Sequence, residues 1–429
     1  MRRIILFYVP MGISSMLAGL THIIINGVLA RAEHPEAAIS SYAVALSLSF
    51  LLDLPMNALR QTSSRYALDR VSFRSVARLT CWVAGSLLAA SAIIAFTPAG
   101  AAIFRYLFGV REELLAPTVQ VYQVLAIMYG ITSLRSLFQG VIINRLRTGW
   151  MTIGMAVRVV VMLAMSWYFV RNGVPDDGRI GALIFMVGLL IECAVAVTEG
   201  RSLRKKLPER QELHYVENIR ELLPFYVPLL YSSLATAVLQ PSIQISLNLS
   251  ANPTLSVASY AVAIQLSNMV AWFCSSVHQI VIHFYMKERR NVLIIVSVLS
   301  LFSPVLLLAV STDAGGNLIL GPVLGMKGAL MEDVKMLLRF FAVQSLLFPW
   351  LDFLTGISML KGRTKAAMIG KISSVALSIA ILIAAVWMSP QLNGRLAGLA
   401  IAAAAPVELL IVFWTLRRMD KPARMWARG

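Results

Sequence analysis

The five residues SYAVA occur twice in the sequence, at positions 41–45 and again at positions 259–263, a shift of 218 residues. Two further stretches repeat at the same shift: FYVP at positions 7–10 and 225–228, and the serine pairs Ser14, Ser15 and Ser232, Ser233. Runs of four and five identities that include Pro and Tyr do not arise readily from apolar composition alone. The sequence therefore predicts an internal duplication.

A second set of matches falls further along each half, at a shift of 216. It pairs Gly140, Arg147, Thr148, Ile153, Gly154, Arg179 and Glu192 with Gly356, Arg363, Thr364, Ile369, Gly370, Arg395 and Glu408. A net loss of two residues near the third apolar segment explains the changed shift. Because each half holds six apolar segments, an even number, we expect both halves to enter the membrane from the same side. Such halves are related by an axis along the membrane normal.

The composition excludes a soluble globule. Of the 429 residues, 58% are hydrophobic and 14% are charged, and the mean hydropathy is +0.74; soluble proteins carry about 25% charged residues. We predict an all-α polytopic membrane protein with about 12 transmembrane helices in two six-helix bundles, related by a pseudo-two-fold axis along the membrane normal. The predicted spans start near residues 4, 39, 78, 115, 150, 179, 222, 256, 289, 331, 364 and 394.

The distribution of Lys and Arg predicts the orientation. With the N-terminus inside, 26 basic residues fall on the cytoplasmic side, 8 on the outer side and 4 within helices. We therefore expect a multi-pass protein of the cell (inner) membrane with both termini cytoplasmic. The expected domains are an N-terminal six-helix bundle (1–200), a cytoplasmic basic connector (201–220), a C-terminal six-helix bundle (221–418) and a cytoplasmic basic tail (419–429).

Short motifs in the first, second, tenth and twelfth spans carry a family resemblance. They comprise Val9, Pro10, Gly12, Ile13, Asn26, Ser41, Tyr42, Ala45, Ser47, Leu48, Pro55, Met56, Leu338, Arg339, Phe341, Leu354, Thr355, Gly356, Met359, Leu360, Lys361, Thr364 and Glu408. These motifs resemble the progressive ankylosis protein family and, through it, the wider MATE-like superfamily of multidrug extrusion proteins, polysaccharide flippases and lipid II flippases. The resemblance implies two six-helix bundles and export of small anions such as pyrophosphate, nucleotide triphosphates or citrate.

Eight Asp, Glu, Lys or Arg residues lie within predicted spans: Asp53, Arg135, Arg158, Glu192, Arg339, Asp352, Lys371 and Glu408. Each costs about 2.5–3.5 kcal/mol on insertion scales for the charged types, so each should face the bundle interior, water or a partner. Guanidinium groups bind phosphate and carboxylate through two parallel hydrogen bonds. We therefore predict Arg135, Arg158 and Arg339 as substrate contacts; the alternative is structural ion pairing with Asp53, Asp352 or a backbone carbonyl.

The intramembrane carboxylates are candidates for a coupling proton or sodium ion. Glu192 and Glu408 are related by the repeat, and burial disfavours their charged form, so either can bind and release a proton. Asp53 and Asp352 complete the predicted coupling-ion set. The alternative for the two glutamates is a polar pin that holds each bundle together.

The first and seventh spans carry an unusual set of polar residues. Among them, Asn26, Gln240 and Gln244 are predicted substrate contacts, with His22 aligned to Gln240 by the repeat. Proline residues in these spans free backbone carbonyls and bend the helices. We expect both spans to line a cleft; the alternative is hydrogen bonding between helices.

Enzyme chemistry has no support in the sequence. No phosphate-binding loop, H-E-x-x-H or G-x-S-x-G motif occurs, and the three cysteines have no metal or disulfide spacing. We expect no catalytic residue, cofactor, metal site or nucleic-acid partner, and a monomer. The predicted function is a secondary-active transporter that exports small organic or phosphate polyanions by alternating access. The alternatives are a flippase for a lipid-linked pyrophosphate or saccharide headgroup and a MATE-type drug or cation antiporter.

Overall fold

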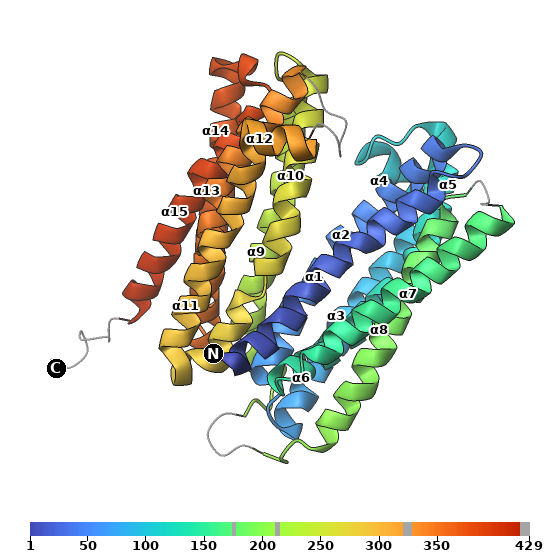
Figure 1. The fold of residues 1–429 in the computed structure, drawn as a ribbon. Helices are drawn as coiled ribbons and strands as arrows, with labels where there is room; N and C mark the ends of the chain where they lie inside the picture. The colour runs from blue at the N-terminus through green and yellow to red at the C-terminus, as the bar shows by residue number, and fades with distance from the viewer. Residues whose placement is uncertain (174–176, 211–214, 321–327, 421–429) are drawn as a thin grey trace, which may run out of the picture. The chain divides into compact units, whose positions relative to one another are not determined.

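The computed structural model describes residues 1–173, 177–210, 215–320 and 328–420. In these residues the chain is helical throughout, with short connections (Figure 1). The helices are α1 (Arg2–Leu29), α2 (Pro35–Tyr66), α3 (Arg70–Phe96), α4 (Pro98–Tyr106), α5 (Glu112–Leu125), α6 (Met128–Asn144), α7 (Gly149–Asn172), α8 (Arg179–Lys205), α9 (Ile219–Asn248), α10 (Pro253–Cys274), α11 (Val277–Ser311), α12 (Asp313–Gly315), α13 (Gly328–Leu360), α14 (Lys365–Met388) and α15 (Arg395–Asp420). A π-helical turn (Gly316–Leu320) follows α12, and a 3₁₀ turn (Pro390–Leu392) precedes α15.

The fold class predicted from the sequence, an all-α polytopic membrane protein, is confirmed. Eleven helical stretches of the described residues are long and apolar enough to cross a membrane. The longest, Pro253–Ser311, has 59 residues and comprises α10 and α11. At 1.5 Å per residue it is long enough for two crossings.

Two span starts differ from the expected positions, and one span is interrupted. The third span starts at Arg70 rather than near residue 78, because Asp69 caps α3 by accepting a hydrogen bond from the Ser72 backbone N–H at 2.7 Å. The fourth span is broken between α5 and α6 at residues 126–127. The ninth span is expected near residue 289, but the helix that contains it, α11, already begins at Val277. The basic residues that precede the apolar run belong to this helix, which is kinked at Glu288 (φ −132°, ψ 45°).

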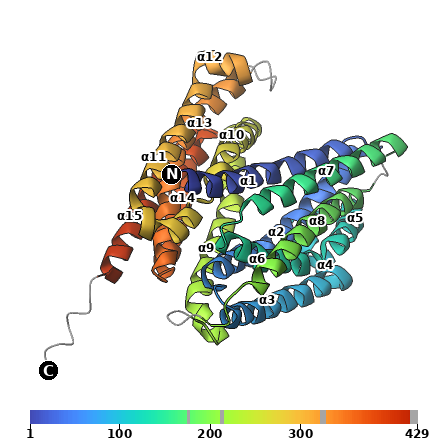
Figure 2. The same ribbon diagram turned by 60° about the horizontal axis from the view of Figure 1, so that its bottom comes forward.

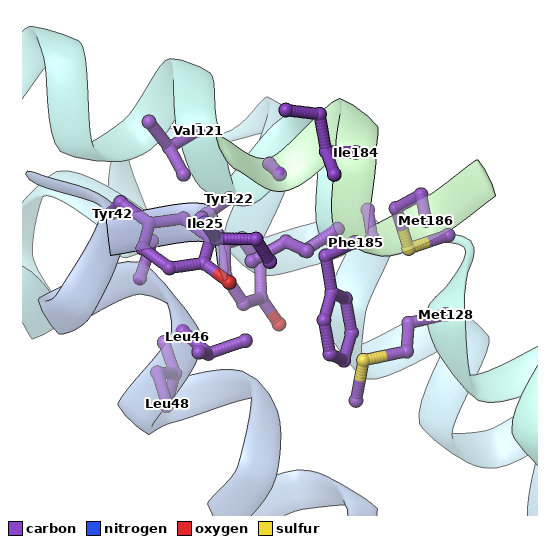
Figure 3. Close-up of a cluster of buried hydrophobic side chains, with 14 of the residues drawn as sticks. Ile25, Tyr42, Leu46, Leu48, Val121, Tyr122, Met128, Ile184, Phe185 and Met186 are labelled. Carbon is purple, nitrogen blue, oxygen red and sulfur yellow. The ribbon is translucent and has the colours of Figure 1, made fainter. Parts of the chain in front are cut away.

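The chain divides into two compact units. The N-unit, Val9–Tyr226, contains α2–α8 and most of α1; within it α6 packs against α2 and α8 (Figure 2). Its apolar core gathers Tyr42 from α2, Tyr122 from α5 and Phe185 from α8 (Figure 3). The Tyr122 hydroxyl donates to Ser91 Oγ at 3.1 Å, so this buried phenol is paired.

The C-unit comprises Met1–Tyr8 and Val227–Gly429. Helix α13 lies between α11 and α15 and packs against both (Figure 1). Phe341 of α13 is fully buried there and meets the ring of Tyr260 from α10 at 6.2 Å. The C-unit therefore has its own hydrophobic core.

Two glycines that the predicted sequence repeat pairs, Gly140 and Gly356, both lie against a neighbouring helix. A Cβ on Gly140 of α6 would overlap the Ser63 side chain and lie 2.8 Å from the Ser64 nitrogen of α2. A Cβ on the repeat-related Gly356 of α13 would lie 2.9 Å from His278 Cα of α11. Both positions therefore require a residue without a side chain, because a neighbouring helix backbone fills the space.

Candidate functional site

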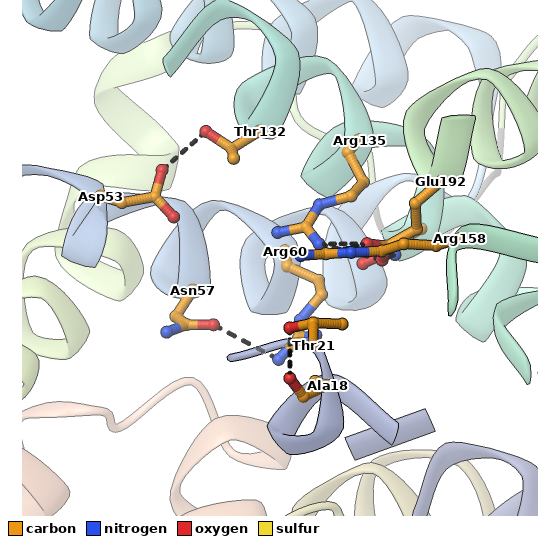
Figure 4. Close-up of polar contacts among 10 residues, drawn as sticks. Ala18, Thr21, Asp53, Asn57, Arg60, Thr132, Arg135, Arg158 and Glu192 are labelled. Carbon is orange, nitrogen blue, oxygen red and sulfur yellow. Dashed lines mark hydrogen bonds and ion pairs between the residues drawn. The ribbon is translucent and has the colours of Figure 1, made fainter. Parts of the chain in front are cut away.

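A buried carboxylate in the N-unit accepts hydrogen bonds from two arginines. Arg135 Nη1 of α6 lies 2.9 Å from Glu192 Oε1, and Arg158 Nη1 of α7 lies 2.8 Å from Glu192 Oε2 (Figure 4). Gln139 donates a third bond at 3.0 Å. Glu192 and Arg158 are only 3% and 4% exposed. Three helices are thus joined through one side chain of α8.

Small residues bring α7 and α8 close enough for this ion pair. A Cβ on Gly188 would lie 2.8 Å from Met162 Cγ and 3.1 Å from Arg158 Cγ. Gly154 lies beside α8 near Glu192, with ordinary contact distances. The aromatic ring of Phe185, 5.1 Å from the Arg158 guanidinium carbon, supports the guanidinium from one face. The packing therefore holds Arg158 in one orientation.

Both arginines line a cavity of about 180 Å³ inside the N-unit. Its walls are formed by Ala18, Thr21, His22, Phe50, Asp53, Met128, Thr132, Arg135, Arg158, Phe185 and Leu189. The Thr132 hydroxyl donates to Asp53 Oδ1 at 2.6 Å, and the His22 ring stacks on Phe185 with 5.9 Å between centroids. The cavity is smaller than typical ligand pockets of about 300–1,000 Å³. In this conformation it has room for a small ion with water.

A third arginine belongs to the same region. Arg60 of α2 is drawn among the cluster residues in Figure 4, donates to Asn57 Oδ1 at 3.4 Å, and interacts electrostatically with Arg135 and Glu192. Arg60 is not among the charged residues that the sequence analysis places within the predicted spans. The signal that could have found it is the spacing of Asp53, Asn57 and Arg60, four and three residues apart, which places them on one helix face.

We call Arg60, Arg135 and Arg158, with Asp53 and Glu192, the arginine cluster. It holds three guanidinium groups and two carboxylates, so it carries one excess positive charge when both carboxylates are ionised. One cation is enough to balance one carboxylate. The cluster therefore holds one guanidinium group more than its two carboxylates can neutralise.

The C-unit places the other predicted residues in separate contacts. Lys371 Nζ of α14 lies 2.5 Å from Glu408 Oε1 of α15. The His278 backbone N–H donates to Asp352 Oδ2 at 2.8 Å, and its Nδ1 lies 3.0 Å from Asp352 Oδ1. Arg339 is exposed and donates to the Ser311 carbonyl at 3.4 Å.

The predicted polar substrate contacts are all exposed side chains. Asn26 lies on α1 in the N-unit, whereas Gln240 and Gln244 lie on α9 in the C-unit. Gln240 Oε1 accepts a hydrogen bond from the Tyr260 hydroxyl at 3.4 Å. A second cavity, of about 220 Å³, has uncharged walls formed by Ser267, Asn268, Ala271, Trp272, Ser275, Gln344, Ser345 and Phe348. None of the predicted contacts Asn26, Gln240, Gln244 and Arg339 lines this cavity or the cavity beside Arg135 and Arg158.

Solved structures resemble the whole chain. One is a MOP superfamily transporter from Pyrococcus furiosus, whose binding pocket has a reverse polarity that suggests a different function. The TM-score is 0.76 at 13% sequence identity, and the match covers 97% of this chain and 95% of that one. A second is an outward-facing multidrug resistance MATE family transporter of the MOP superfamily, with TM-score 0.76, 12% identity and the same coverage. The chain has the fold of a MATE transporter.

A eukaryotic MATE transporter shares this fold as well, with TM-score 0.71, 14% identity and coverage of 97% of this chain and 95% of that one. No protein-family model and no curated protein matches the sequence. Within the described part of this MATE fold, no group of three His, Cys, Asp or Glu side chains is arranged to hold a metal ion.

Proposed function

We propose that the protein is a secondary-active transporter that exports small organic or phosphate polyanions, such as pyrophosphate, citrate or nucleotide-like anions, by alternating access. Its place is the cell membrane, with both termini cytoplasmic. The MATE fold supports transport as the class of activity. The observation that carries the substrate class is the excess of arginines over carboxylates in the arginine cluster, three against two.

The two ion pairs of Glu192 provide a way for an anion to bind, by taking the place of Glu192 on one of the two arginines. Arg135 and Arg158 each form a charge-assisted hydrogen bond to Glu192 and also line the cavity. An anion that enters can take one guanidinium while the other remains with Glu192, so neither the carboxylate nor the substrate is left uncompensated. Arg60 is not a wall residue of the cavity and forms no ion pair among the described contacts, but it adds a positive charge that interacts electrostatically with Glu192 and Arg135. Arg339, Asn26, Gln240 and Gln244 remain predicted contacts.

Asp53 is the coupling group that the contacts favour among the four predicted carboxylates. Glu192, Glu408 and Asp352 contact Arg, Lys and His side chains, respectively. Asp53 contacts a hydroxyl, lies at the wall of the cavity and faces the same space as Arg135. Uptake of a proton or a sodium ion at Asp53 therefore breaks no ion pair and changes the charge of the cavity by one unit.

The same cluster suits a second function, a flippase for a lipid-linked pyrophosphate headgroup, because the recognised group is again a phosphate anion. A MATE-type drug or cation antiporter is disfavoured, since the excess arginine repels a cationic substrate. Transport assays separate the three.

The test uses purified protein in liposomes with an imposed pH gradient. Flux of labelled citrate and pyrophosphate is measured beside that of a cationic dye and of a fluorescent lipid pyrophosphate. We expect gradient-driven anion flux. Dye flux alone would overturn the anion proposal, and lipid translocation alone would favour the flippase.

The decisive variant is Arg60→Gln, which removes one positive charge and leaves the Glu192 ion pairs in place. Anion flux at low substrate concentration should fall about tenfold, as expected for one lost charge-assisted hydrogen bond. Arg111→Gln is the matched control, because Arg111 is exposed at the start of α5. Equal flux in both variants would exclude Arg60 from substrate binding.

A further inference from the structure

A second, larger cavity of the N-unit lies where the start of α3 meets the end of α8. Its volume is about 710 Å³. Its walls are formed by Arg70, Phe73, Arg74, Ala77, Arg78 and Cys81 of α3 and by Arg204 and Lys205 of α8. We call these eight residues the basic pocket. None of them belongs to the arginine cluster.

Five of the eight residues are basic, and none is acidic. Backbone carbonyls hold two of the guanidinium groups: Arg70 donates to the Lys205 carbonyl at 2.9 Å and Arg78 to the Glu217 carbonyl at 2.8 Å. Arg204 lies over the Phe73 ring, with its guanidinium carbon 5.4 Å from the centroid. These contacts hold the three guanidinium groups in position. They do not neutralise the positive charges, because a backbone carbonyl and an aromatic ring carry no net charge.

Acidic side chains near the basic pocket do little to balance it. Glu209 lies 3.9 Å from Arg70, but its side chain is 92% exposed, and an exposed pair of this kind is worth little. Asp69 caps α3 through the Ser72 backbone N–H and hydroxyl. Arg74 and Lys205 are exposed, and the described contacts give them no carboxylate partner. The basic pocket therefore attracts anions strongly.

The walls of the basic pocket are also partly apolar. Phe73, Ala77 and Cys81 add apolar surface between the cations. Further along α3, large apolar side chains point outward from the unit: Trp82 is 74% exposed and Phe96 is 70% exposed. Since α3 is a candidate membrane span, this surface suits acyl chains. A basic end continued by an apolar helix surface matches a molecule with a phosphate head and hydrocarbon chains.

We propose that the basic pocket binds the headgroup phosphate of an anionic phospholipid, with the acyl chains lying along α3. Basic pockets between membrane helices on the cytoplasmic side bind such headgroups. The positive-inside distribution predicts the cytoplasm at this end of the unit. The bound lipid joins the start of α3 to the end of α8, the helix that carries Glu192.

Native mass spectrometry of the full chain tests the proposal after exchange into phosphatidylglycerol or into phosphatidylcholine with the same acyl chains. We expect one retained phosphatidylglycerol and no retained phosphatidylcholine. The variant Arg74→Gln/Lys205→Gln should bind phosphatidylglycerol about 30-fold more weakly, taking each basic residue near an anionic surface as a factor of about five. The charge-preserving variant Arg74→Lys/Lys205→Arg should bind it like the parent.

The matched control is Arg111→Gln/Arg171→Gln, which removes two exposed charges outside the basic pocket. It should retain the lipid. Equal lipid retention in the control and in Arg74→Gln/Lys205→Gln, or equal retention of both lipids by the parent, would overturn the proposal. Displacement of the lipid by millimolar inorganic phosphate would also overturn it, because the acyl chains would then contribute nothing.

Discussion

Lys371 Nζ lies 2.5 Å from Glu408 Oε1 and joins α14 to α15. Glu408 is related by the repeat to Glu192, which joins α6 and α7 to α8 through Arg135 and Arg158. Both halves therefore retain a glutamate at the same place and use it to connect helices. The partners differ: one lysine in the C-unit and two arginines in the N-unit. Among the described contacts, an excess cation lies beside the glutamate of the N-unit and not beside that of the C-unit.

The first prediction concerns the stability of this lysine pair. Lys371→Met leaves Glu408 without its cation and should lower the free energy of unfolding by roughly 1–3 kcal/mol, less than for a fully buried pair because the lysine side chain is 31% exposed. The double variant Lys371→Met/Glu408→Gln should recover most of the loss. A double-mutant cycle from thermal unfolding in detergent measures this, and additive losses would show that the pair contributes nothing.

The second prediction ranks substitutions at the N-unit glutamate. Glu192→Gln leaves the buried guanidinium of Arg158 and the partly buried guanidinium of Arg135 without a carboxylate, so it should destabilise by roughly 3–5 kcal/mol. Arg135→Gln leaves Glu192 with Arg158 and should cost roughly 1.5–3 kcal/mol. Melting temperatures of the purified variants give the order. The reverse order would mean that Glu192 is balanced by groups other than these two arginines.

The third prediction locates the coupling group. Asp53→Asn should keep anion binding but abolish the dependence of flux on the pH gradient, because the amide cannot take up a proton. Glu192→Gln/Glu408→Gln, measured on its folded fraction, should keep that dependence if both glutamates act as pins. Gradient-driven flux in liposomes distinguishes the two; lost coupling in the double variant together with normal coupling in Asp53→Asn would reverse the assignment.

The fourth prediction uses the repeat-related glycines. Gly140→Ala and Gly356→Ala each force a methyl group against a neighbouring helix and should destabilise by about 1–3 kcal/mol. Gly85→Ala is the control, since a Cβ there meets no atom within 4 Å and alanine favours a helix. Unchanged melting temperatures for both of the first two variants would contradict the close packing described above.

The sequence was a good guide to the helices because each membrane span needs a long apolar run. It was a poorer guide where a helix continues beyond that run. The polar cap at Asp69 and the basic turn that begins at Arg70 belong to α3, and Arg60 belongs to α2, although their charge makes them resemble loop residues. Basic residues near helix ends were therefore assigned to loops.

The sequence reveals which charged residues lie within the spans, but it does not reveal which of them form ion pairs with one another. The cost of burying a charge marked Arg135, Arg158 and Glu192 as special from the sequence alone. Which carboxylate meets which arginine depends on the rotation and depth of separate helices, and neither follows from hydropathy. The sequence suggested Asp53 or Asp352 as partners, whereas in the structure Glu192 binds both arginines. Arg339 lies in the C-unit and makes its contact with Ser311.

The excess arginine has an electrical consequence. Moving one elementary charge across the whole bilayer at 100 mV changes its energy by about 2.3 kcal/mol. With Asp53 and Glu192 ionised, the arginine cluster carries one net positive charge, so any step that moves the empty cluster through part of this field is driven or opposed by the membrane potential. A bound monovalent anion cancels that charge, and a polyanion reverses its sign. Voltage therefore acts in opposite directions on the empty protein and on the protein loaded with a polyanion.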